Sequence, residues 1–389
     1  MFAKRISRLG TETAFEVLAR ARELERQGRE VIHLEIGEPD FDTPRFICDA
    51  AIEALNDGRT HYAPSAGLLE VRETIAQVVG SSRGIPVTPD NVVITPGAKP
   101  ILFFTLLACV EEGDEVIYPN PGFPIYESVV NFLGAKAVPL PLREERGFTF
   151  DLDEFASLVN DRTKFVIINT PQNPTGAVLS RKDLEGIAKI LEGRDLWVLS
   201  DEVYNRILYE GEHHSIASMP GMGEKVIILD GWSKTFAMTG WRLGFGVMRK
   251  DLAACVTRLV TNCNSCTNTF VQLAGMKALR GPDDEVKKMV SEFRRRRDVI
   301  VDGLNEIPGI SCTRPKGAFY VFPNVKELPM DSIKLARALL DEAGVAALSG
   351  TAFGAFGNGY LRFSYANSVE NLRKGLDRIG NFVAELRTR

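Results

Sequence analysis

Short apolar runs without polar alternation are the feature that most constrains how this chain can fold. They recur between residues 91 and 230 and are separated by polar clusters and helical patterns. The runs are NVVIT (91–95), DEVIY (114–118), KFVIIN (164–169), LWVLSDEVY (196–204) and KVIILD (225–230). Strands of Val, Ile and Leu that lack a polar face are typically buried on both sides. The pattern therefore predicts an α/β fold with a mostly parallel sheet flanked by helices.

After about residue 282 the pattern changes to long helical stretches separated by short strands. This change predicts an α+β layer. A chain of 389 residues is also longer than one hydrophobic core usually supports. We therefore predict a large α/β domain over residues 46–285 and a smaller α+β domain built from residues 1–45 and 286–389. The smaller domain would include a helix over residues 11–27.

Charge and composition exclude several classes of protein. The formal net charge of −4 leaves no basic surplus for binding a nucleic acid. The N-terminal sequence does not resemble a signal peptide, and no apolar run is long enough to span a bilayer. The 6 cysteines are irregularly spaced and the chain has only 4 histidines, so we expect neither a disulfide framework nor a metal site. The sequence predicts a cytoplasmic protein with no membrane partner.

Polar clusters directly follow four of the apolar runs. They are TPGAKP (95–100), TPQNPTG (170–176), SDEVY (200–204) and GWSK (231–234). In an open parallel sheet, ligands bind at the carboxyl ends of the strands. We therefore expect the four clusters to converge on one site.

Two of these clusters have the chemistry of an anion site. Gly97 opens a turn and Pro100 lies just inside the next helix, so free backbone amides and the helix dipole could bind an anion. Ser233 and Arg242 could add hydrogen bonds to phosphate or carboxylate oxygens. Each feature alone also fits a plain turn or a surface arginine.

Asp201 and Lys234 indicate which kind of ligand would carry the anion. A carboxylate at the end of a buried strand is costly unless a cation lies close, although a capping role is the alternative. A desolvated lysine near other cations has a lowered pKa and can form a Schiff base. A phosphate cradle, a lysine for an aldehyde and a carboxylate for a pyridine nitrogen are together the requirements of pyridoxal 5'-phosphate (PLP).

The sequence resembles the class I aminotransferases of fold type I, close to the bacterial and archaeal aspartate aminotransferases. The resemblance runs from IGEPDFDTP (36–44) through THYAPSAG, PGAKP, NPGFPIY, NTPQNPTG, SDEVY and SKTFAMTGWRLG to YLRFSYA (360–366). It implies a large domain with a mostly parallel seven-stranded sheet. It also implies an amino-acid:2-oxo-acid aminotransferase that works by a ping-pong cycle, with 2-oxoglutarate and glutamate as one substrate pair.

The resemblance assigns the residues around the cofactor ring. Lys234 would bind the aldehyde and later move a proton, and Asp201 would pair with the pyridine nitrogen. Asn173 and Tyr204 would hydrogen-bond the ring oxygen, and Phe123 would stack on the ring.

The phosphate would be bound by residues of three segments. The resemblance implies contacts from the Gly97 turn, the Ala98 and Lys99 amides, Ser233 and Arg242. Tyr62 matches a tyrosine that reaches the phosphate from the other subunit, which implies a homodimer with shared sites.

The substrate residues are also implied by the resemblance. Arg362 would clamp the α-carboxylate beside Gly37, and Asn173 would lie next to it. Lys99 matches a lysine that meets a distal carboxylate in some relatives, which favours dicarboxylic substrates modestly. Pro100 and Phe123 depart from the residues common in close relatives, Gln and Trp respectively.

Two alternatives stay open at the level of sequence. A PLP-dependent carbon-sulfur lyase, or another PLP enzyme of this fold, could use the same lysine and aspartate. The fold also occurs as a ligand-sensing module of transcription regulators. Such a regulator would need a helix-turn-helix before the resemblance begins near residue 5, so we expect an enzyme instead. The donor amino acid and the pathway are not specified by these motifs.

Overall fold

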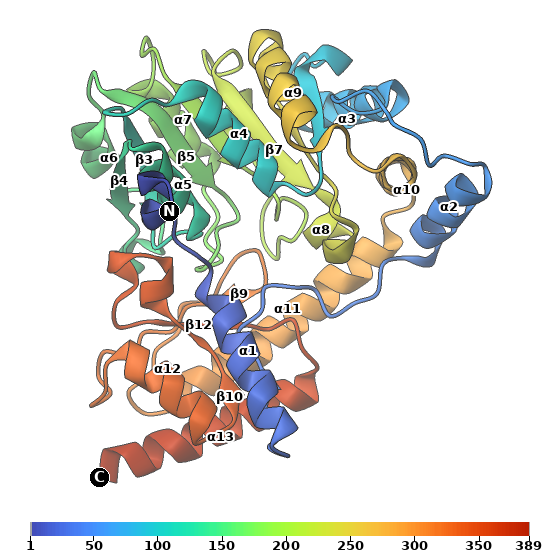
Figure 1. Ribbon diagram of the computed structural model, residues 1–389. Helices are drawn as coiled ribbons and strands as arrows, with labels where there is room; N and C mark the ends of the chain where they lie inside the picture. The colour runs from blue at the N-terminus through green and yellow to red at the C-terminus, as the bar shows by residue number, and fades with distance from the viewer. Residues whose placement is uncertain (1, 389) are drawn as a thin grey trace.

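The computed structural model describes residues 2–388, and its largest element is a seven-stranded sheet (Figure 1). The strand order is β2-β8-β7-β6-β5-β3-β4. The strands are β2 (Val92–Thr95), β3 (Glu115–Asn120), β4 (Lys136–Pro141), β5 (Thr163–Asn169), β6 (Trp197–Asp201), β7 (Val226–Gly231) and β8 (Gly244–Val247). β8 pairs antiparallel with both β2 and β7, and the other pairings in this sheet are parallel. The predicted mostly parallel sheet is confirmed.

Two of the strands were not predicted, and their composition explains why. β4 carries Pro139 and Pro141, and it lies at the edge of the sheet, where a missing amide donor is tolerated. β8 reads GFGV, in which two glycines interrupt the apolar run. Neither segment has the continuous Val, Ile and Leu signal of the other strands.

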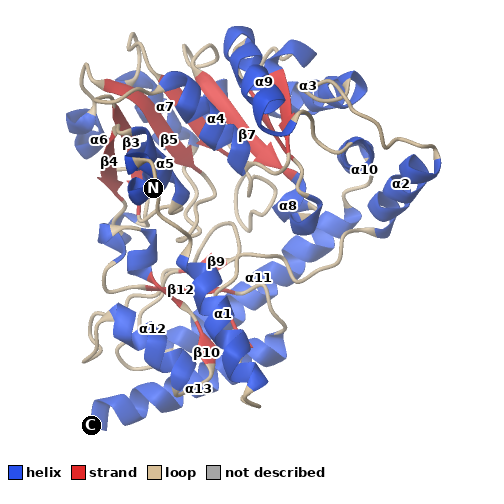
Figure 2. Ribbon diagram, in the orientation of Figure 1, coloured by secondary structure: helices blue, strands red, loops and turns tan. Residues whose placement is uncertain are grey.

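Helices cover both faces of the sheet (Figure 2). Alternate strand residues belong to two hydrophobic clusters: Val93, Ile167 and Leu199 to one, and Ile94, Val166 and Val198 to the other. The helices are α2 (Arg45–Asn56), α3 (Leu69–Arg83), α4 (Lys99–Cys109), α5 (Ile125–Leu133), α6 (Leu152–Leu158), α7 (Arg181–Ile190), α8 (Trp232–Thr235), α9 (Lys250–Asn264) and α10 (Thr269–Arg280). Burial on both faces accounts for the absence of polar alternation in the strands.

N-terminal and C-terminal residues together form an α+β layer against the carboxyl ends of the large sheet (Figure 1). Its strands are β1 (Ile32–His33), β9 (Tyr320–Val321), β10 (Val345–Ala346), β11 (Leu348–Ser349) and β12 (Leu361–Ser364). Its helices are α1 (Thr13–Arg26), α11 (Asp284–Asn305), α12 (Ser332–Asp341) and α13 (Val369–Thr388). The run VAAL (345–348) is divided between two sheets, because β10 pairs with β1 and β11 pairs with β12.

The N-terminal residues contact both layers. The 3-10 helix η1 (Lys4–Arg8) lies against α5, and the Gly10 amide donates to Ser128 Oγ at 2.9 Å. Helix α1 instead contacts β10 and β11 of the C-terminal layer. The chain therefore crosses between the layers at residues 10–12, next to the strand ends where polar clusters were predicted to meet. The predicted domain limits remain a prediction.

A close backbone approach fixes the first of these clusters. β2 pairs with β8 so that Thr95 faces Gly244. A Cβ atom at Gly244 would lie 2.4 Å from the Ala98 nitrogen and 2.5 Å from the Gly97 carbonyl carbon. Only glycine therefore allows the turn after β2 to lie this close to β8, and this turn leads into α4.

Candidate active site

The predicted clusters do converge, on a cavity of about 570 Å³ at the carboxyl ends of the central strands. Residues from the α+β layer close its other side. Of the predicted site residues, the following line it: Gly37, Ala98, Lys99, Phe123, Asn173, Asp201, Tyr204, Ser233, Lys234, Arg242 and Arg362. Gly97 does not line the cavity, but it directly precedes Ala98, which does. Tyr62 does not line the cavity, and it is 89% exposed.

Lys234 projects from the short helix α8, which directly follows β7. Its Nζ donates a hydrogen bond to the Gly37 carbonyl oxygen at 2.6 Å. Removal from water lowers the pKa of Lys234 to about 8, against the opposing effect of the Glu38 carboxylate. At pH 7 about a tenth of the amine is therefore neutral, far more than for an ordinary lysine, and the neutral form is the one that a nucleophile or base requires.

Asp201 is the last residue of β6, and it is only 7% exposed. Burial raises its pKa to about 6, although the Tyr126 hydroxyl donates to Oδ2 at 2.5 Å and opposes the rise. A carboxylate in this position is stabilised by a cation, and a protonated pyridine nitrogen has the required charge. Tyr126, on α5, was not predicted, because nothing in its sequence context places it against β6.

Arg362 lies on β12, is 4% exposed and reaches into the cavity from the α+β layer. Its guanidinium packs against the rings of Tyr320 and Phe353, with its central carbon 4.6 and 4.9 Å from their centroids. Nη2 donates to the Glu35 carbonyl oxygen, and Nη1 lies 3.4 Å from Asn173 Oδ1. Burial lowers the pKa of Arg362.

The Nε atom of Arg362 is buried and has no hydrogen-bond partner within residues 2–388. A buried donor without a partner is costly, and a guanidinium edge matches a carboxylate. The arrangement therefore fits a ligand carboxylate. Gly37 borders this position, and a Cβ there would lie 2.1 Å from Tyr320 Oη. Tyr320, whose hydroxyl is 2.8 Å from that of Tyr204, was also missed by sequence reasoning.

The anion cradle lies at the start of α4. Gly97 has φ +91°, and a Cβ there would lie 2.1 Å from Arg242 Nη2. Arg242 itself has φ 53° and donates from Nη1 to the Thr239 carbonyl oxygen at 2.7 Å. Backbone amides at a helix start, beside a guanidinium and the Ser233 hydroxyl, fit a phosphate. With Lys234, Asp201 and the Phe123 ring around one cavity, the residues fit PLP.

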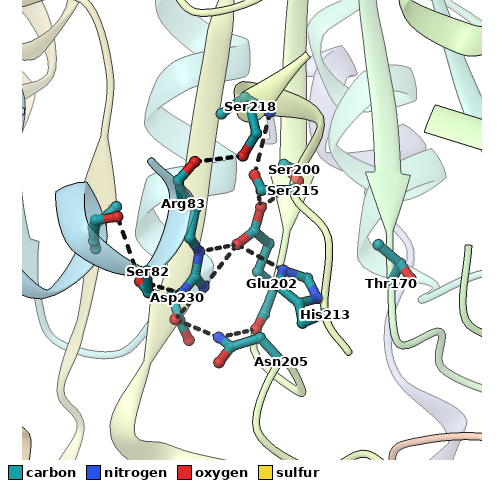
Figure 3. A network of polar contacts seen from close by, with 12 residues as sticks. Ser82, Arg83, Thr170, Ser200, Glu202, Asn205, His213, Ser215, Ser218 and Asp230 are labelled. Atoms are coloured by element: carbon teal, nitrogen blue, oxygen red, sulfur yellow. Dashed lines mark hydrogen bonds and ion pairs between the residues drawn. The ribbon is translucent and has the colours of Figure 1, made fainter. Parts of the chain in front are cut away.

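A buried polar network centred on Glu202 joins the end of α3 to β7 (Figure 3). Glu202 follows Asp201, is fully buried and accepts from Arg83 Nε and Nη2 at 3.0 and 2.8 Å. Although burial opposes it, the Arg83 charge, aided by the neighbouring His213 ring, holds the pKa of Glu202 well below its usual range. Asn205 Nδ2 then joins the Glu202 carbonyl to Asp230 of β7. The network was not predicted, because Arg83 is 119 residues away from Glu202 in the sequence.

Comparison with known proteins identifies the class to which this fold and site belong. The family described as "Aminotransferase class I and II" matches residues 29–379. Aromatic-amino-acid aminotransferase 2 of Thermococcus litoralis is 42% identical over 91% of this chain and 92% of that protein. Aspartate aminotransferase of Pyrococcus abyssi is 42% identical over 92% of both chains. The structure of Thermus thermophilus aspartate aminotransferase with maleate has a TM-score of 0.93 and 37% identity, covering 98% of this chain and 99% of that one.

The chain therefore belongs to the class I and II aminotransferases. It is a PLP-dependent aminotransferase near the aspartate aminotransferase branch. The predicted class of enzyme and its cofactor are confirmed.

The buried network generates a prediction about stability. Arg83→Met leaves Glu202 buried without its cation, so we expect a loss of about 3–5 kcal/mol in the free energy of unfolding. Urea unfolding monitored by circular dichroism measures this loss. Arg181→Met is the matched control, since Arg181 pairs with Glu185 at the surface with side-chain exposures of 70% and 51%. The control should change stability by under about 1 kcal/mol; equal effects of the two substitutions would contradict the assigned role of Arg83.

The lowered pKa of Lys234 generates a second prediction. Only the neutral amine attacks an aldehyde, so the rate at which PLP is taken up by the cofactor-free protein should rise with pH through a midpoint near 8. Stopped-flow absorbance at a series of pH values measures this rate. Lys234→Ala should remove the pH-dependent phase. A midpoint above 10, the range of an ordinary lysine, would show that Lys234 is not desolvated as described.

Proposed function

We propose that the chain transfers amino groups between L-amino acids and 2-oxo acids, with Lys234, Asp201 and Arg362 as the residues that carry the reaction. The observation that supports this most strongly is their convergence on one cavity, with the buried Nε of Arg362 still able to bind a carboxylate oxygen. PLP, when bound, supplies an electron sink for the negative charge that develops at the substrate Cα.

Each residue then has a task set by its surroundings. Arg362, held between two rings, binds the substrate α-carboxylate with two parallel hydrogen bonds and so fixes the direction of the Cα–H bond. Lys234 Nζ would take the proton from the substrate Cα and pass it to the cofactor in the first half of the cycle, and it would carry a proton back to Cα in the second half, a task that suits a pKa of about 8. Asp201, anchored by Tyr126, offers the buried negative charge that keeps a ring nitrogen protonated.

The remaining predicted residues have positions that suit binding. Ala98, Lys99, Ser233 and Arg242, with the Gly97 turn behind them, would hold the phosphate. Phe123 would stack on the cofactor ring, and Asn173 and Tyr204 would contact the ring oxygen. The neighbouring Tyr320 hydroxyl would orient Tyr204 through their 2.8 Å contact.

The substrate range is proposed to be broad and to include 2-oxoglutarate as amino acceptor. Lys99 at the cavity wall offers a cation for a distal carboxylate, while Phe123 and Phe353 offer apolar surface to an uncharged side chain. Relatives at the same identity are named for aspartate and for aromatic amino acids. Both kinds of donor are therefore to be tested.

A panel of single amino acids tests the function. The PLP-loaded protein, without any oxo acid, should release one oxo acid per site and no ammonia. Release of pyruvate with ammonia would indicate the lyase alternative. Arg362→Lys, which loses the planar two-pronged donor, should lower kcat/KM for every donor by about 10²-fold while PLP stays bound. Loss of bound PLP, measured by absorbance, would contradict the role of Arg362.

We also propose a homodimer in which Tyr62 completes the neighbouring site. Its 89% exposure and its position away from the cavity of its own subunit support this. Other exposed apolar side chains accompany it nearby in the sequence, at Ile52, Leu55 and Leu69. An interface would remove this surface from water.

Mixed dimers test whether sites are shared. Tyr62→Ala should weaken PLP binding by about tenfold, the value of one lost hydrogen bond. Mixing inactive Lys234→Ala subunits with Tyr62→Ala subunits at limiting PLP should raise activity above the sum of the two. That gain arises because one site of each mixed dimer combines an intact Lys234 with an intact Tyr62. Strict additivity, or a monomer in sedimentation, would contradict the shared site.

We also propose a cytoplasmic location. Among the helices of residues 2–388, none is long and apolar enough to cross a membrane. Fractionation of cells that produce the full chain would test the location.

A further inference from the structure

One cation of the cavity already has a carboxylate partner from the protein. Glu12 is the N-cap residue of α1, but its side chain does not cap the helix. Instead Glu12 Oε1 accepts a hydrogen bond from Lys99 Nζ, at the start of α4. The contact joins the α+β layer to the large sheet, and both residues line the cavity.

The pair lies among apolar and aromatic side chains of the cavity wall. The Lys99 ammonium lies 5.3 Å from the centre of the Phe123 ring, which faces the same cavity. Ala14 and Phe15, from the first turn of α1, line it beside Glu12. The Glu12 side chain is 17% exposed and that of Lys99 is 48% exposed, so the carboxylate is turned inward more than its partner.

The Glu12 charge also acts inside the cavity. It opposes the lowering of the pKa of Lys234 and of Arg362, two residues at the reacting end of the site. Glu38 is another carboxylate near Lys234, but it accepts a hydrogen bond from Thr239. Glu12 is therefore the carboxylate that a substrate with a second acid group would meet at Lys99.

We propose that Glu12 is a specificity-determining residue that competes with the distal carboxylate of a substrate for Lys99. This inference rests on the proposed transamination and deepens it. With an uncharged side chain in the pocket, Glu12 stays on Lys99, so the ammonium is not left unpaired against apolar surface. With a dicarboxylate, the substrate must displace Glu12 or bind beside a like charge, so the preference for dicarboxylates is reduced.

The same residue thereby allows one pocket to accept both kinds of substrate. A lysine alone would favour dicarboxylates and penalise aromatic side chains, and an apolar wall alone would do the reverse. A movable internal carboxylate balances the charge in either case. An exposed ion pair without this role would contribute little to binding or to stability.

Steady-state kinetics of the PLP-loaded enzyme test the proposal with Glu12→Gln. The ratio of kcat/KM for glutamate to that for phenylalanine should rise roughly tenfold, since a like charge beside the distal carboxylate is removed. Glu16→Gln, one turn further along α1 at an exposed position, is the matched control and should leave the ratio unchanged. An unchanged ratio in Glu12→Gln would overturn the proposal.

A double-substitution cycle shows whether Glu12 acts through Lys99. In a Lys99→Met background, Glu12→Gln should raise the ratio by much less than in the parent enzyme. An equal rise in both backgrounds would mean that Glu12 repels dicarboxylates without holding Lys99, and would overturn the competition.

Ligand binding separates this inference from the proposed function. Calorimetry should show that Glu12→Gln tightens maleate, a dicarboxylate, roughly tenfold and leaves 3-phenylpropionate within about twofold. If no amino acid yields an oxo acid but this shift in binding appears, the proposed transamination fails while the role of Glu12 holds. If transamination occurs and maleate binds equally to both proteins, the role of Glu12 fails alone.

Discussion

Removal of charged groups from water at the carboxyl ends of the central strands is the constraint on which the site depends. Burial shifts the pKa of Asp201 up to about 6 and that of Lys234 down to about 8, and it lowers the pKa of Arg362. In each case burial disfavours the charged form. Under the proposed function, a protonated ring nitrogen would compensate the buried charge of Asp201 and a substrate carboxylate that of Arg362, while the cofactor aldehyde would react with the neutral form of Lys234. Burial of these ionisable groups therefore both makes the site reactive and reduces the stability of the folded protein.

Two neighbouring residues of β6 and its loop show how locally this effect is controlled. Asp201 and Glu202 are both buried, yet the pKa of Asp201 is raised whereas that of Glu202 is lowered. The difference is the Arg83 guanidinium, which makes two hydrogen bonds to Glu202, while the main partner of Asp201 is the neutral Tyr126 hydroxyl. Glu202 can thus remain ionised as a fixed anchor of the strand end. Asp201 has a neutral main partner, so a bound cationic group would supply its counter-charge.

Much of this arrangement could be predicted from the sequence, because the signals were local. Continuous Val, Ile and Leu runs marked the central strands, and polar clusters directly after them marked where Lys234 and Asp201 would meet. The strands β4 and β8 were not predicted, because prolines interrupt the apolar pattern of β4 and glycines interrupt that of β8. A different reason explains why the sequence did not predict the roles of Tyr126, Tyr320 and the Arg83–Glu202 pair. Their partners are distant in the sequence, and a single sequence contains no signal for a contact that exists only after the layers pack.

Two cations of the cavity, Lys99 and Arg362, would meet the two ends of the proposed amino-acid substrate. Lys99 has its own carboxylate partner in Glu12, so under our proposal its availability depends on which substrate side chain lies beside it. Arg362, by contrast, has only carbonyl and amide oxygens as described hydrogen-bond partners, and its buried Nε lacks one in the part of the chain that the structure describes. The α-carboxylate is common to every amino acid and every 2-oxo acid, so a permanently available arginine suits it. The side chain differs between the two substrates of one cycle, and a cation whose charge can be balanced internally suits that end.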